Sequence, residues 1–209
     1  MPISPVPDHV DALQREVQRK FGRNLLRLQQ YERLIKTIVA EHDIAGSSSD
    51  LFNNRTAQYG AVATKTLGQV VGSLVGNFIV PTSNSPSSSN ADEPPVDMTK
   101  PWVRMTSRIE FSEENFKRIE LSLATLVDLR NDLVHHFLEK HDIWSEAGCL
   151  AAIAQLDECF NLIDASHEEL VQWARHSTVT RAAMASFINS PEFEGLLVHA
   201  TQKSETDLD

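Results

Sequence analysis

Apolar residues recur every three or four positions over most of the chain, which is the spacing of one face of an α-helix. In the segment 8–42 the residues with this spacing are Val10, Leu13, Val17, Phe21, Leu25, Leu28, Tyr31, Ile35 and Ile38. The pattern predicts one long amphipathic helix there. After a Gly- and Ser-containing break at 45–54, the same spacing predicts a second helix over 55–79.

Two further helices are predicted in the second half of the chain. Ser112, followed by two glutamates, is typical of a helix start, because its side chain can cap a free amide and acidic residues interact favourably with a helix N-terminus. From there the apolar spacing continues to Phe137. Ser145 is a second cap, for a helix that reaches Trp173, and two short helices are expected over 178–197.

No segment alternates between apolar and polar residues over a useful length, so the predicted fold class is all-α, a bundle of four to five main helices. The segment 81–101, PTSNSPSSSNADEPPVDMTKP, has a different composition. It cannot bury enough apolar area to offset its ordering entropy, which predicts a disordered, flexible insertion. The expected organisation is a helical bundle over 8–176, interrupted by this insertion, and a short helical or flexible acidic tail over 177–209.

The composition narrows the class of function. The 209 residues include 29 acidic and 19 basic side chains, for a net charge of −10. This balance argues against a broad cationic surface for long duplex nucleic acid but leaves room for a local basic patch. Two cysteines make no disulfide framework and the N-terminal residues lack a secretory signal, so a cytoplasmic location is expected. The most apolar run, 67–80, is too short to cross a bilayer, and no membrane partner is expected.

A local basic patch lies on the first predicted helix. Between residues 15 and 36 there are seven basic and two acidic side chains. They suffice for a few phosphate contacts, so this face is a candidate RNA-binding surface; the alternative is an ordinary solvated helix face. The candidate RNA-binding residues are Arg15, Arg19, Lys20, Arg23 and Arg27.

The segment 130–137, RNDLVHHF, is unusual for a plain helical bundle. At about 100° per residue, Arg130 projects onto the centre of the apolar stripe, where an arginine is costly unless it is paired or faces a site. In the structural interpretation, Arg130 bonds a carboxylate such as Asp157 or Glu158 and the neighbouring histidines lie in solvent. The other interpretation is a catalytic site.

The sequence RNDLVHH resembles the Arg-x4–6-His signature of HEPN domains, with Asn131 as the polar residue that often follows the arginine. The stretch 109–173 and the N-terminal segment FGRNLLRLQQYERLIK also look like a bacterial HEPN-like group, so the resemblance covers residues 10–175. It implies a dimeric four-helix-type bundle in which two copies of the motif meet across the interface. Many such domains are metal-independent ribonucleases of toxin–antitoxin or phage-defence systems. Others are inactive and bind only RNA or partner proteins.

The resemblance also implies roles for individual residues. RNA carries its own nucleophile, the 2′-OH, so neither a metal nor another cofactor is expected. A histidine exchanges protons near neutral pH, and an arginine can neutralise the charge that develops on phosphate oxygens. Carried over to this chain, His135 is the first choice for acid/base catalysis and His136 its rival, with Arg130 for charge stabilisation and Asn131 for positioning. The expected partners are a second copy of the chain, RNA, and an antitoxin or another protein. The alternative is a non-catalytic dimeric module that binds RNA or protein.

The helical projection raises a difficulty for this site. On a straight helix His135 lies about 140° from Arg130, and His136 about 120° away on the other side. Neither imidazole would then reach Arg130 within one chain. The site requires either a distorted last turn or the arginine of one protomer beside the histidine of its partner.

Other candidates for chemistry are weaker. The two cysteines and His141 lack the paired spacing of a zinc site. The tryptophans are isolated in the sequence and are expected in the core or in an interface rather than as stacking platforms for bases; they are Trp102, Trp144 and Trp173.

Overall fold

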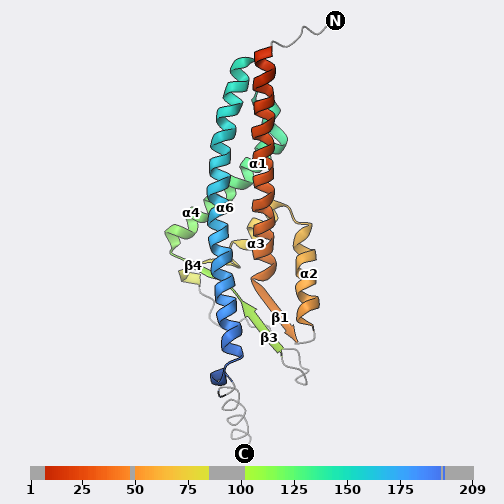
Figure 1. Ribbon diagram of the computed structural model, residues 1–209. Coiled ribbons are helices and arrows are strands. Elements are labelled where there is room, and N and C mark those ends of the chain that lie inside the picture. Colours follow the sequence, from red (N-terminus) through yellow and green to blue (C-terminus); the bar gives the residue numbers. More distant parts are fainter. Residues whose placement is uncertain (1–7, 48–49, 85–101, 194, 196–209) are drawn as a thin grey trace, which may run out of the picture. The chain divides into compact units, whose positions relative to one another are not determined.

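The computed structural model describes residues 8–47, 50–84, 102–193 and 195 (Figure 1). The helices are α1 (Asp8–Glu41), α2 (Leu51–Ala63), α3 (Leu67–Leu74), α4 (Glu113–Asn131), α5 (Phe137–Lys140) and α6 (Glu146–Ile188). A π-helical turn, η3 (Asp132–His136), joins α4 to α5, and a short 3-10 turn, η1, covers Thr82–Asn84. The strands are β1 (Asp43–Ser47), β2 (Ile79–Pro81), β3 (Trp102–Thr106) and β4 (Ile109–Phe111). The all-α prediction is confirmed.

The chain divides into two compact units, Met1–Leu170 and Val171–Asp209. The second unit contains the C-terminal part of α6 and a turn, in which Ser190 Oγ accepts a hydrogen bond from Phe193 N at 3.4 Å. The prediction of two short helices over 178–197 is wrong for the first of them, because α6 continues to Ile188. The sequence from 149 to 190 contains no proline or glycine that would end the helix.

Helix α1 and the part of α6 before Leu170 lie side by side in the first unit (Figure 1). The predicted long N-terminal helix is confirmed, and its apolar stripe supplies much of the core, including Tyr31 and Ile35. One polar side chain, Asn24, is fully buried among these apolar groups. Its Nδ2 donates to the backbone oxygen of Leu156 at 2.9 Å, which fixes the register between the two helices.

The single helix predicted over 55–79 is wrong, since α2 and α3 are separate helices and β2 follows them. Thr66 begins α3 with a capping box. Its Oγ1 accepts from Gln69 N at 3.4 Å, while its own backbone N donates to Gln69 Oε1 at 2.9 Å. Gly76, at φ +85°, turns the chain away from helical geometry before β2.

The four strands were not predicted, because three to five residues are too few for a period-two pattern. β1 pairs antiparallel with β3, and β2 pairs parallel with β4. Arg104 on β3 donates a hydrogen bond to the Asp43 carboxylate on β1 at 2.7 Å, which stabilises the β1–β3 pair. The prediction of a flexible insertion over 81–101 is wrong for residues 81–84, which belong to β2 and η1, and residues 85–101 lie outside the described part of the chain. No described helix is long and apolar enough to span a membrane.

Candidate functional site

The helix that carries Arg130 does not continue straight through the motif. α4 ends at Asn131, the five residues of η3 form a π-helical turn, and α5 begins at Phe137. A π turn contains more residues than an α turn, so it changes the angular position of every residue in and after it. Of the two arrangements that the sequence left open, the distorted last turn is therefore present.

The wide turn is anchored on both sides by side-chain contacts. Leu133 and Phe137 are both buried, and the Phe137 ring lies 4.8 Å from the ring of Phe21 on α1. Lys140 Nζ forms an ion pair with Asp132 Oδ2 at 2.6 Å, which links α5 to the first residue of η3. This ion pair lowers the pKa of the Asp132 carboxyl, so the carboxylate is ionised at neutral pH.

The π turn brings Arg130 and His135 together within one chain. Arg130 Nη1 lies 3.5 Å from His135 Nε2 and 3.2 Å from Asn131 Oδ1. The first distance is at the long end of the hydrogen-bond range. For Arg130 to donate to Nε2, the imidazole must be neutral with its proton on Nδ1. His135 is exposed, so a ligand can reach the pair.

The second histidine is engaged elsewhere. His136 Nδ1 lies 2.9 Å from Glu139 Oε2, and the two histidine rings are 6.3 Å apart. The structure thus brings together Arg130, Asn131 and His135 but not His136. Glu139 was not predicted as a functional residue, and it is the partner of the rival histidine. Its spacing of three residues from His136 on a helix is the signal that would have found it.

Arg130 is half-buried at the end of α4, rather than enclosed at the centre of the apolar stripe. The structural interpretation expected it to bond Asp157 or Glu158. Asp157 instead lies 2.5 Å from Lys20 Nζ and 3.3 Å from Arg23 Nη2. No carboxylate in the described part of the chain pairs with Arg130, so its charge is available to an anionic ligand.

All five candidate RNA-binding side chains of α1 have carboxylate partners. Arg15 and Arg19 pair within α1, with Asp11 and Glu16. The other three reach α6, where Lys20 and Arg23 share Asp157 and Arg27 contacts Asp164 at 2.6 Å. Much of the basic stripe therefore joins two helices. Arg15 and Arg19 remain at the surface in pairs that contribute little in water and that a phosphate can replace.

No protein-family model, curated protein or solved structure matches this chain. The HEPN resemblance therefore depends on the residues that carry it, and function must be argued from the geometry around Arg130 and His135.

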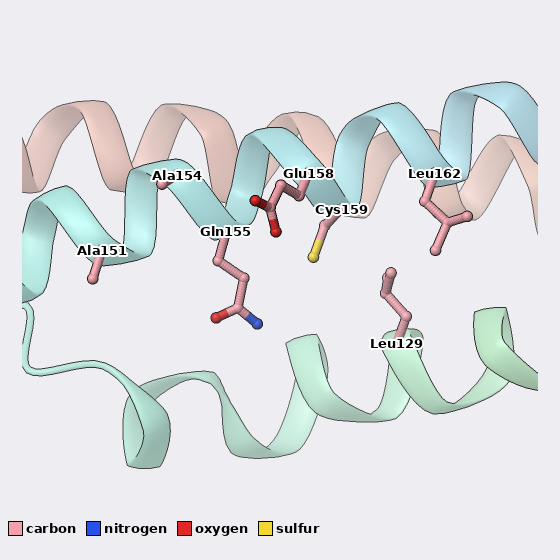
Figure 2. A pocket seen from close by; sticks show the side chains of 7 residues that line it. All are labelled: Leu129, Ala151, Ala154, Gln155, Glu158, Cys159 and Leu162. Carbon is pink, nitrogen blue, oxygen red and sulfur yellow. The ribbon is translucent and has the colours of Figure 1, made fainter.

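A cavity of about 510 Å³ lies between α4 and α6, next to the motif (Figure 2). Figure 2 shows Gln155 and Cys159 of α6 pointing toward α4, with Leu129 pointing toward them from the other side. Burial raises the pKa of the Cys159 thiol, so it stays protonated at neutral pH and is a poor nucleophile. Within the described ranges, no three or more His, Cys, Asp or Glu side chains gather as a metal site would require.

The tryptophans differ from one another. Trp173 is buried, as expected for a core position, whereas Trp144 is 71% exposed, so of the two expected positions, core or interface, the core is excluded for Trp144. It follows a turn in which its backbone N donates to Asp142 Oδ1 at 3.2 Å, a local bond that holds the ring at the surface. The side chain of Trp102 lies outside the described part of the chain.

Proposed function

We propose that the protein is a metal-independent endoribonuclease that cleaves RNA by attack of a 2′-OH on the adjacent phosphate. The observation that carries the proposal is the approach of Arg130 Nη1 to His135 Nε2, at 3.5 Å, on a distorted helical turn. An exposed acid/base group beside a cation without a described carboxylate partner is the minimum that this reaction needs. The resemblance of RNDLVHH to the HEPN signature supports the same chemistry.

The neutral imidazole is the acceptor in the first step. When a phosphate arrives, Arg130 exchanges its contact with His135 for a stronger, charge-assisted bond to a non-bridging phosphate oxygen. Nε2 is then free to take the proton of the 2′-OH as the O2′–P bond forms and the P–O5′ bond breaks. The departing O5′ takes a proton from the imidazolium or from water. The products are a 2′,3′-cyclic phosphate and a 5′-OH.

In this mechanism Asn131 is a positioning residue. Its Oδ1 accepts from Arg130 Nη1 at 3.2 Å and so holds the guanidinium beside the imidazole. Asn131→Ala is expected to lower the cleavage rate less than loss of Arg130 itself, because the charge remains while its orientation is lost.

The test is incubation of the purified protein with total RNA in EDTA, followed by analysis of the ends. We expect 2′,3′-cyclic phosphates, and we expect Arg130→Ala and His135→Ala each to lower the rate by about 100-fold or more. His136→Ala is the matched control, since this neighbouring exposed histidine contacts Glu139 instead. Absence of cleavage by the wild-type protein, or loss of activity only in His136→Ala, would contradict the proposal.

The proposal includes a homodimer. Helices α4 and α6 expose apolar side chains: Leu121 is 70%, Leu150 50% and Leu162 38% exposed. Leu162 lines the cavity between the two helices, and a second copy would remove this apolar area from water. Light scattering should give twice the chain mass for the wild type and the chain mass for Leu150→Glu/Leu162→Glu. A toxin or defence nuclease that is neutralised by another protein would also bind that antitoxin. Co-purification of the protein from its native host tests for such a partner.

A second candidate is a non-catalytic dimeric module that binds RNA or protein. The observation that favours it is the use of Lys20, Arg23 and Arg27 to join α1 to α6, which takes three of the five candidate RNA-binding side chains away from a substrate. In that case Arg130→Ala changes association or partner binding, and RNA incubated with the wild-type protein keeps its original ends.

A further inference from the structure

A second cavity lies at the turn between α5 and α6. Its volume is about 350 Å³, within the range of small-ligand sites, and it is lined by Leu138, Glu139, His141, Asp142, Ile143 and Trp144. Two of these side chains, Leu138 and Trp144, are each 71% exposed. Adjacent exposed apolar groups of this size, unlike single scattered ones, indicate a contact surface.

The turn holds this surface in place. The backbone oxygen of Ile143 accepts from Gln14 Nε2 on α1 at 2.9 Å and from the thiol of Cys149 on α6 at 3.1 Å. Asp142 caps the Trp144 amide at 3.2 Å. A ligand that stacks on Trp144 therefore meets a loop whose ordering cost has already been met by folding.

The cavity is close to the candidate catalytic pair. Glu139 lines it and also contacts His136, whose ring is 6.3 Å from that of His135. Through His136 and Glu139 the cavity is thus connected to the candidate pair, so one single-stranded RNA that spans both can have a phosphate at Arg130 and a base at the cavity.

We infer that this cavity binds a base of single-stranded RNA stacked on Trp144, with guanine preferred. The inference deepens the proposed function and rests on it. An exposed indole is a stacking platform for an unpaired base. The carboxylates of Glu139 and Asp142 supply hydrogen-bond acceptors, and the imidazole of His141, which also lines the cavity, can donate or accept. Beside its O6 acceptor, guanine presents two adjacent N–H donors, N1–H and the N2 amino group, whereas adenine, cytosine and uracil each present one donor group on that edge.

The charge of the cavity also separates the base from the phosphate. Two carboxylates at its wall repel a phosphate, while Arg130, nine residues before Glu139 in the chain, attracts it. The same carboxylates disfavour an apolar protein side chain, because its burial would desolvate them without new hydrogen bonds. A base with N–H donors is not repelled by the carboxylates and gives them new hydrogen bonds.

The experiment measures binding of labelled pentanucleotides by fluorescence anisotropy. Each is a 2′-O-methyl oligomer of uridines with a central guanine, adenine, cytosine or uracil. We expect the guanine oligomer to bind most tightly to the wild type, and Trp144→Ala to weaken that binding by about 5- to 100-fold. Trp144→Phe should retain most of the affinity. Phe52→Ala is the matched control, since Phe52 is an exposed aromatic (79%) on α2 and should not affect binding.

Isosteric changes test the choice of base. Glu139→Gln and Asp142→Asn keep the shape of the wall but add donors, so they should reduce the preference for guanine over adenine at least several-fold. Unchanged affinity in Trp144→Ala, or an unchanged base preference in the double isosteric variant, would overturn the inference. Because 2′-O-methyl oligomers lack the nucleophile, binding is measured whether or not the protein cleaves RNA. Trp144-dependent binding without cleavage of ordinary RNA refutes only the ribonuclease, and cleavage unaffected by Trp144→Ala refutes only the base site.

Discussion

The same substitution is expected to have opposite effects at two helical glycines. Gly148 lies in the first turn of α6 and Gly72 inside α3, and neither has a positive φ. Intrinsic helix propensity favours alanine over glycine by about 1 kcal/mol at such positions. A Cβ added at Gly72 would meet no atom within 4 Å, so Gly72→Ala should raise the free energy of unfolding by about 0.5–1 kcal/mol.

At Gly148 the neighbouring backbone makes the same substitution destabilising. A Cβ there would lie 1.9 Å from the backbone oxygen of Asp142 and 2.7 Å from its carbonyl carbon, where real Cβ contacts stay beyond 3.0 Å. The carbonyl must therefore move by more than about 1 Å, a large shift in a packed turn. The adjacent Ile143 oxygen, held by Gln14 and Cys149, would move with it. Overpacking and weakened hydrogen bonds outweigh the helical gain, and we expect a net loss of about 2–3 kcal/mol.

Urea unfolding followed by circular dichroism measures both variants under the same conditions. The expected order of midpoints is Gly72→Ala above wild type and Gly148→Ala well below it, with similar slopes. A Gly148→Ala protein as stable as the wild type would show that the turn before α6 relaxes freely, which would also remove the pre-organisation invoked for Trp144.

Two further predictions concern polar contacts of the first unit. The hydrogen bond from Arg104 lowers the pKa of the Asp43 carboxyl in the folded protein. The ionised carboxylate therefore stabilises the fold fully at pH values above its pKa in the unfolded chain, near 3.8, and this stabilisation is lost as the pH falls through the folded-state pKa. Asp43→Asn should therefore lower the urea midpoint at pH 7 but much less at pH 3; an equal loss at both would contradict the linkage. Asn24→Ala removes the bond to the Leu156 oxygen and should cost about 1–3 kcal/mol in urea unfolding. Ser166→Ala, a buried control whose hydroxyl bonds only within α6, should cost less, and a reversed order would refute the role of Asn24.

Local signals in the sequence predicted much of the helical framework. The apolar spacing of 8–42 gave α1, and Ser112 caps α4 through a bond from Asn115 N at 3.4 Å. The interruption between α2 and α3 was missed because the apolar spacing continues across it. The start of α3 is indicated instead by two polar residues. Thr66 and Gln69 have the Thr-x-x-Gln spacing of a capping box.

The candidate site was predictable in its residue types but not in its contacts. A straight helix separates Arg130 from His135, and the sequence indicated that a distortion or a second protomer was needed. The π turn ends just before Phe137, whose ring packs 4.8 Å from Phe21, more than a hundred positions earlier in the chain. The apolar spacing of the sequence continues through Phe137 as it would on a straight helix, so a π turn cannot be deduced from the motif alone.

The distribution of charge restricts what ligand the site can take. The full chain has a net charge of −10, and Lys20, Arg23 and Arg27 are engaged by α6, so the basic face of α1 offers little free charge to a long polyanion. A duplex, which requires many simultaneous phosphate contacts, is therefore a poor ligand. In the proposed ribonuclease, Arg130 holds one phosphate and the cavity beside Trp144 takes an unpaired base. A single-stranded segment meets both requirements of this proposal, and base stacking on Trp144 would then supply affinity that phosphate contacts along α1 do not.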